Sequence, residues 1–208
     1  MSVCVHYWAI PPQSRLYQRL QQDSAFNTLM ASLFPYGCGI YRLFEIEPEE
    51  VEEIIDAVIQ RHRAVLGSNT KARCRIAEVR AELERTCVEF PGIEKRAYMV
   101  EKCSSDIEQR LLQALRNDHP DAAELTSKML FGDKLLAPHL RKPGEDILGL
   151  ASLSLVQEAA GILGRLRPKY LFPSSEGWEK WCRENYTKWR KMYLETAEHG
   201  EEILIGVS

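Results

Sequence analysis

Residues 173–208 constrain the fold more than any other part of the chain, because an aromatic helical pattern is followed there by a terminal apolar run. Aromatic and apolar residues recur at steps of three and four, the spacing that aligns side chains along one face of a helix. These residues are Trp178, Trp181, Cys182, Tyr186, Trp189, Tyr193 and Ala197. The opposite face carries Lys180, Arg183, Glu184, Lys188, Arg190 and Lys191. The pattern predicts an amphipathic helix that begins near Ser174 and ends at Gly200, since glycine readily adopts the left-handed conformation that follows a helix.

The aromatic stripe has two interpretations, a stacking platform for bases or a cofactor and a buried core. We favour the core, because aromatic side chains bury large areas and dominate packing. Residues 203–207 then predict a strand, which is stable so close to the terminus only when it pairs within a sheet. Residues 3–10 are rich in β-branched and aromatic side chains and predict an opening strand that ends at two prolines. We expect these two strands to be neighbours.

The rest of the chain is dominated by helical periodicity, with residues 97–100 as a third strand. Two capping boxes, Ser105 with Glu108 and Ser154 with Gln157, mark predicted helix starts. Residues 135–149 form the longest irregular stretch and are the candidate for a mobile loop. Together the patterns predict an α+β fold, predominantly helical, with a small mixed sheet that includes the N-terminal and C-terminal strands. At 208 residues we expect one domain over residues 1–208.

Charge and cysteine usage exclude several partners and compartments. The formal net charge is −3, which gives no general attraction to nucleic acid or to an anionic membrane, so we expect neither partner. No apolar run approaches the ~20 residues that span a bilayer. The six cysteines contain no CxxC pair, and the N-terminus shows no signal peptide. Reduced thiols and a cytoplasmic location are the expectation.

Sequence motifs for chemistry are missing from the chain. The five histidines show no HxxH or HExxH spacing, and neither GxSxG nor a glycine-rich phosphate loop occurs. We therefore predict no catalytic residues, no metal and no cofactor, and lean against an enzyme. The candidates for a ligand site or an interface are His6, Tyr7, Trp8, Asp106, Glu108, His139, Trp178 and Trp181. Each has a simpler interpretation: core packing for His6 and Trp8, helix-start charge for Asp106 and Glu108, and solvent exposure for His139.

The end of the chain resembles a known family. Tyr193, Ala197 and Gly200, followed directly by a terminal apolar strand, resemble the ending of the YfbM-like family of bacterial proteins of unknown function. The helix predicted to begin at Ser154 resembles the serine-led helix that precedes that ending. The chain lacks the family's midchain tryptophan–histidine pair, and its residues 47–91 form a longer insertion. The resemblance implies a cytosolic α+β domain with a small sheet, and it supplies no catalytic residues.

Two functional hypotheses follow. The first is a protein-interaction or regulatory module, including an immunity-type partner of another bacterial protein or a homo-oligomer, and it predicts an interface wherever the closing helix exposes a tryptophan. The alternative is a small enzyme or ligand-binding protein with a pocket beneath residues 135–149.

Overall fold

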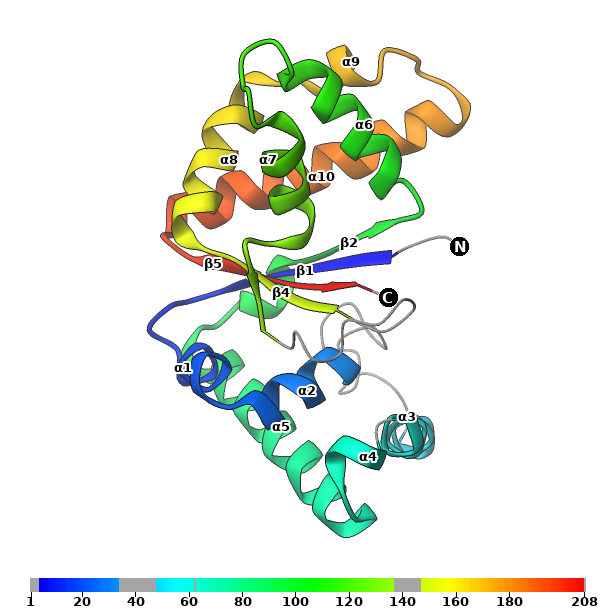
Figure 1. Ribbon diagram of the computed structural model, residues 1–208, viewed down its shortest axis with the longest axis vertical. Helices are drawn as coiled ribbons and strands as arrows, with labels where there is room; N and C mark the ends of the chain where they lie inside the picture. The colour runs from blue at the N-terminus through cyan, green and yellow to red at the C-terminus, as the bar shows by residue number, and fades with distance from the viewer. Residues whose placement is uncertain (1–3, 34–47, 62, 137–146, 208) are drawn as a thin grey trace.

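In the described residues, five antiparallel strands form one sheet with a layer of helices on each face (Figure 1). The computed structural model describes residues 4–33, 48–61, 63–136 and 147–207 of the chain. The strand order is β2-β1-β5-β4-β3, so the opening and closing strands lie side by side within the sheet. The predicted α+β fold, mostly helical and built on the two terminal strands, is confirmed.

The register of the sheet fixes both ends of the described chain. β1 (Cys4–Ile10) pairs with β2 (Ala97–Glu101) on one side and with β5 (Glu202–Val207) on the other. β5 also pairs with β4 (Ile147–Ala151), and β4 pairs with the short β3 (Lys134–Leu135). Because β5 has a partner on each side, its backbone groups are satisfied by ladder hydrogen bonds, which holds the terminal strand in place.

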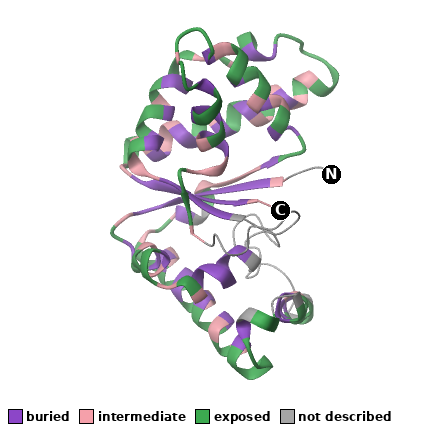
Figure 2. Cartoon of the chain, in the orientation of Figure 1, coloured by how far each residue is buried: buried purple, intermediate pink, exposed green. Residues whose placement is uncertain are grey.

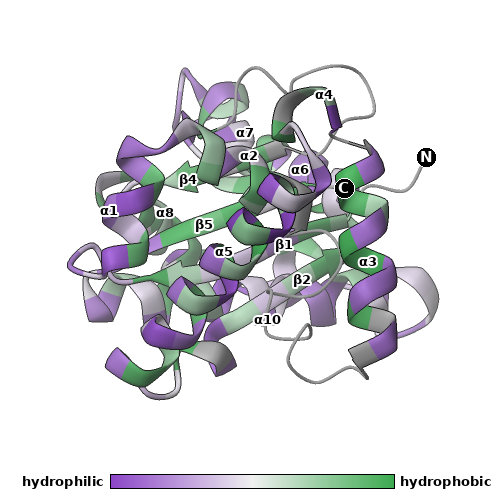
Figure 3. Ribbon diagram, turned by 90° about the horizontal axis from the view of Figure 1, so that it is seen from below, coloured by the Kyte–Doolittle hydropathy of each residue, from purple (hydrophilic) through white to green (hydrophobic). Residues whose placement is uncertain are grey.

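The sheet separates two hydrophobic cores. Successive side chains of a strand point to opposite faces, so Tyr7 packs in the core above the sheet and Trp8 in the core below it. Figure 2 shows β1 and β5 almost wholly buried between helices whose outward faces are exposed, whereas the edge strand β2 is mostly half-buried and β3 is exposed. Seen from below, β1 and β5 are hydrophobic along most of their length (Figure 3), as expected for strands covered on both faces.

The helices above the sheet in Figure 1 come from the C-terminal half of the chain. They are α6 (Ser104–Leu115), α7 (Ala122–Phe131), α8 (Leu153–Arg165), α9 (Pro168–Leu171) and α10 (Gly177–His199). α10 places Tyr186, Trp189 and Tyr193 in the upper core with no exposed surface. Full burial of such a side chain contributes on the order of 2–3 kcal/mol, so this stripe is a main source of the layer's stability.

The helices below the sheet all lie between β1 and β2 in the chain, so one continuous stretch covers the lower face. They are α1 (Arg15–Gln22), α2 (Ser24–Leu33), α3 (Pro48–Arg61), α4 (Arg63–Leu66), α5 (Asn69–Glu89) and the 3₁₀ helix η3 (Ile93–Arg96). α1 and α2 pack against α5, and α3 and α4 pack against α5 from its other end.

Two expectations about the sheet are corrected. Its described strands are all antiparallel rather than mixed, because the connections from β1 to β2 and from β4 to β5 leave and re-enter the sheet at the same end, whereas a parallel pair needs a crossover to the opposite end. The stretch 135–149 is not irregular at its two ends, where β3 and β4 lie. Residues 137–146 between them are outside the described residues.

Three predicted helix starts are also corrected. α6 begins after Cys103 with no side-chain cap, so Ser105 and Glu108 do not form a capping box at its start. α8 is capped by Ser152, whose hydroxyl accepts a hydrogen bond from the Leu155 backbone N–H, two residues before the predicted serine. α10 begins at Gly177 rather than near Ser174, because the Ser174 hydroxyl accepts from the Glu176 backbone N–H in a turn outside the helix.

Over residues 4–33, 48–61, 63–136 and 147–207, no helix combines the length and the apolar character that crossing a bilayer would require.

Candidate functional site

The three candidates on β1 are His6, Tyr7 and Trp8, and all three are buried. The Tyr7 hydroxyl donates to the Leu130 carbonyl at 3.0 Å, and the Trp8 indole N–H donates to the Ile93 carbonyl at 3.2 Å. A buried aromatic residue typically satisfies its polar atom in this way. The two bonds tie β1 to α7 above and to η3 below. His6 is 3% exposed on the lower face of the sheet.

Burial of His6 gives the protein a predicted pH dependence. Desolvation lowers the pKa of His6 from 6.5 to about 4. The unfolded chain therefore binds a proton at this residue as the pH falls below 6.5, while the folded protein stays neutral there until about pH 4. The free energy of unfolding is expected to fall by about 2 kcal/mol between roughly pH 7 and pH 4.5 from this group alone.

Urea unfolding of wild type and His6→Gln at both pH values measures this contribution. The wild type is expected to lose about 2 kcal/mol more than the variant on acidification. Equal acid sensitivity of the two proteins would contradict the assignment to His6.

The remaining described candidates lie on α6 and at the start of α10, two helices of the upper layer that contact each other. Asp106 and Glu108 are half-buried in the first turns of α6, and His139 is outside the described residues. Trp178 and Trp181 lie at the start of α10, with ring centroids 4.9 Å apart. Trp178 is 52% exposed, so this member of the aromatic stripe is not core and the inward-facing prediction is wrong for it. The structure does not gather these candidates into one site.

A groove of about 560 Å³ runs between the start of α9 and the middle of α10. Its lining contains five basic residues and one acidic residue, a net charge of +4 in a chain whose net charge is −3. The charged members are Arg167, Lys169, Arg183, Glu184, Lys188 and Arg190. Tyr170, which follows the lining residue Lys169, is 70% exposed. We name this feature the basic groove.

In the described part of the chain, Arg190 is the groove cation whose side chain hydrogen-bonds to a neighbouring helix. Its Nε donates to the Leu163 carbonyl at 2.6 Å and its Nη2 to the Gly164 carbonyl at 3.0 Å. Carbonyls in the last turn of a helix lack intrahelical partners, so this guanidinium closes the end of α8. The same contact holds α10 against α8 and fixes one wall of the basic groove.

The other four groove cations are Arg167, Lys169, Arg183 and Lys188, and within the described chain none forms an ion pair. The Lys169 ammonium lies over the Tyr170 ring, 5.3 Å from its centroid. Six arginines elsewhere do pair with carboxylates: Arg15, Arg19, Arg73, Arg85, Arg96 and Arg110. The basic groove therefore concentrates cations whose counter-charge is not supplied by the described fold.

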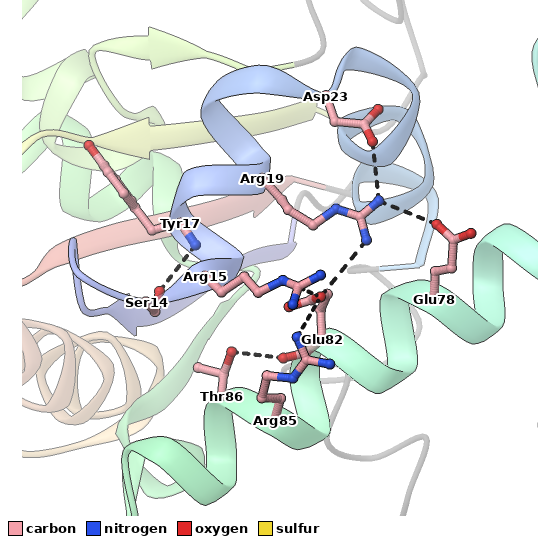
Figure 4. A network of polar contacts seen from close by, with 9 residues as sticks. All are labelled: Ser14, Arg15, Tyr17, Arg19, Asp23, Glu78, Glu82, Arg85 and Thr86. Carbon is pink, nitrogen blue, oxygen red and sulfur yellow. Dashed lines mark hydrogen bonds and ion pairs between the residues drawn. The ribbon is translucent and has the colours of Figure 1, made fainter.

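A second charged cluster joins α1 to α5, and it is balanced. The Glu82 carboxylate is 4% exposed and faces Arg15 Nε at 3.0 Å and Arg85 Nη1 at 3.2 Å (Figure 4). Arg19 reaches Asp23 at 3.2 Å and Glu78 at 3.3 Å from the same nitrogen. Three cations face three carboxylates, so the charges of the cluster balance and its ion pairs link the two helices, while the buried Oε2 of Glu82 accepts no hydrogen bond from the described residues.

A polar pocket of about 290 Å³ lies between α7 and the start of α8. Two pairs of its charged and polar lining residues are engaged with each other. Lys128 pairs with Glu124 at 2.5 Å, and Asp133 accepts from the Ser152 backbone N–H and hydroxyl at 2.8 and 2.6 Å. These bonds cap α8 and order the turn before it, which gives the pocket a structural role. In the part of the chain that the structure describes, no three histidine, cysteine, aspartate or glutamate side chains are placed to hold a metal ion.

The buried thiols have little nucleophilic character. Burial raises the pKa of Cys103 to about 12 and also raises the pKa of Cys182. A thiol attacks as its thiolate, so a raised pKa removes the reactive form at neutral pH. Among the described residues, Cys4, Cys74, Cys87, Cys103 and Cys182 form no disulfide, and Cys38 lies outside the described residues.

Comparisons of the chain with family models, with curated proteins and with solved structures gave no match. The basic groove is therefore characterised by its own geometry. Sequence reasoning had placed Arg183, Lys188 and Arg190 on the solvent face of the closing helix. It did not bring Arg167 and Lys169 to them, because these two residues belong to a separate short helix. The one signal in the sequence was charge density, with eight basic and three acidic residues between positions 165 and 191.

Proposed function

We propose that this chain is a cytoplasmic protein-interaction module, of a regulatory or immunity type, that binds another protein through the basic groove. The observation that carries the proposal is the groove itself, with four cations that have no carboxylate partner among the described residues and with the exposed ring of Tyr170 next to Lys169. Arginine and tyrosine are enriched at protein interfaces and often supply most of the binding energy. The resemblance to the YfbM-like family, whose activity is unknown, adds no catalytic group.

The groove supports binding better than catalysis. Its charged groups are arginine and lysine with a single glutamate, so it contains no pair of groups suited to proton transfer at neutral pH. Long basic side chains also offer apolar stems, which a partner can cover while their charged ends remain hydrated. A concave surface of this kind suits a segment of another protein.

Capture from native cell extract tests the proposal with a matched pair of variants. Tyr170→Ala/Arg183→Ala removes one aromatic and one cation at the basic groove, whereas Val88→Ala/Lys71→Ala removes one exposed apolar side chain and one cation on α5. A specific partner is expected to be retained by the wild type and by the α5 variant and to be reduced at least tenfold by the groove variant. Identical proteins captured in equal amounts by all three would contradict the proposal.

A further inference from the structure

We infer that the segment held in the basic groove is acidic, with several aspartate or glutamate residues close together in an extended stretch of the partner protein. The inference rests on the proposed function and names the chemistry of its partner. Carboxylates are the groups that complement Arg167, Lys169, Arg183 and Lys188. Guanidinium groups bind them through two parallel hydrogen bonds and ammonium groups as point charges.

The placement of the cations suits a short segment. Arg183 and Lys188 are five residues apart on α10, a separation of roughly 7.5 Å along the helix axis at 1.5 Å per residue. An extended chain advances about 3.3 Å per residue, so carboxylates two or three positions apart in the partner match this separation. Arg167 and Lys169 face them from the other wall of the groove, so a single strand running between the walls meets cations on both sides.

The distribution of charge favours a protein segment over nucleic acid. The groove lining carries +4 and the whole chain −3, so the rest of the molecule carries −7. A nucleic acid carries a charge at every nucleotide and continues beyond the groove, where this negative surface repels it. An acidic stretch within an otherwise neutral segment places its charge in the groove alone.

The environment of the groove also argues against a lipid surface. The cations line a shallow groove between two helices, and the net negative charge of the rest of the chain opposes binding to an anionic bilayer. Tyr170, whose ring lies under the ammonium of the lining residue Lys169, adds an exposed ring that can cover the aliphatic part of a glutamate or an apolar residue flanking the acidic stretch. The combination of cations and one aromatic is the complement of a mixed acidic and apolar peptide.

Fluorescence anisotropy with the full chain tests the inference directly. The probe is a labelled peptide of about ten residues with alternating aspartate and glutamate, and the control peptide replaces them with asparagine and glutamine. The acidic peptide is expected to bind at least tenfold more tightly than the neutral one. Its affinity should fall at least fivefold when the salt concentration rises from about 50 to about 300 mM, because free ions screen the charges.

Two variants with the same change in net charge locate the site. Arg183→Glu/Lys188→Glu reverses two groove cations and is expected to weaken binding of the acidic peptide at least tenfold. Lys71→Glu/Lys95→Glu reverses two exposed lysines in the lower layer and is expected to change it less than twofold. Circular dichroism and the thermal midpoint confirm that both variants are folded. Equal weakening by the two variants would show a non-specific effect of net charge and overturn the inference.

Competing ligands separate the sources of negative charge. The competitors are a ten-nucleotide oligothymidylate and vesicles with about 30% phosphatidylserine. The acidic-segment inference is overturned if either one binds more tightly than the acidic peptide and depends equally on Arg183 and Lys188. The proposed function fails separately, if partner capture does not depend on the groove. Capture that depends on the groove, together with absence of acidic-peptide binding, leaves the interaction function standing and shows that the partner chemistry is different.

Discussion

Replacing Trp189 with alanine is expected to lower the free energy of unfolding by about 4 kcal/mol, within the range measured for truncating a fully buried tryptophan. Trp189 has no exposed surface and lies against three other aromatic rings, those of Tyr7, Tyr186 and Tyr193, with centroids 6.1, 6.1 and 5.0 Å away. Tyr7 belongs to β1 and the other two to α10. The cavity left by the substitution would therefore open between the sheet and the helix that covers it, where neither side can collapse without moving a whole element.

The same substitution at Trp178 provides the control. Trp178 lies on the same helix and is 52% exposed, so Trp178→Ala is expected to cost less than about 1 kcal/mol. Urea unfolding followed by far-ultraviolet circular dichroism compares the two, since tryptophan fluorescence itself changes with each substitution. Equal destabilisation by the two variants would show that Trp189 does not occupy the centre of the upper core.

Replacing Gly149 with alanine is expected to lower the free energy of unfolding by about 3 kcal/mol, the upper part of the range for overpacking. A Cβ at this position would lie 2.3 Å from the Phe131 carbonyl oxygen, a backbone atom at the end of α7. Gly149 pairs with Ile205 of β5 and with Leu135 of β3, so the strand is fixed on both sides. Relief of the clash requires α7 to move away from the sheet or the ladder to break.

Gly161→Ala is the matched control for this prediction. Gly161 lies within α8, and a Cβ there would meet no atom within 4 Å. Alanine in a helix is favoured over glycine by about 0.5–1 kcal/mol, so this variant is expected to be more stable than the wild type. Thermal unfolding of both variants gives the test. A thermal midpoint of Gly149→Ala equal to that of the wild type would show that α7 and β4 do not pack as closely as in the structure.

Local patterns were enough to predict the elements at both ends of the chain. The closing helix, the terminal strand and the opening strand each have a strong period or a β-branched composition, and the structure places them at 177–199, 202–207 and 4–10. β4 was missed because its sequence, ILGLA, is short, contains a glycine and is covered by helices on both faces, so it has no alternation of polar and apolar residues. The predicted starts of α6 and α8 failed because a serine followed by an acidic or amide residue is common, and neighbouring residues decide which serine caps the helix.

The candidate site depended on tertiary structure more than the fold did. The sequence showed that one face of the closing helix is basic, which is usual for a solvated face. It did not show that Arg167 and Lys169, at the start of α9, lie across from that face. It also did not show that the Arg190 side chain hydrogen-bonds to a carbonyl at the end of α8. The helical periodicity also did not predict the exposure of Trp178, because it identifies which residues share one face of the helix but not how far along the helix the core extends.

The sequence by itself determined the fold class, the two terminal strands and the aromatic helix between the core and solvent, because hydrophobic periodicity is a local property that each segment carries alone. Tertiary structure alone decided the antiparallel order of the sheet, the end of the aromatic core before Trp178, and the meeting of α9 with α10 that creates the basic groove. These features depend on contacts between separate segments of the chain. The free energy of such contacts cannot be inferred from the sequence pattern of any one segment.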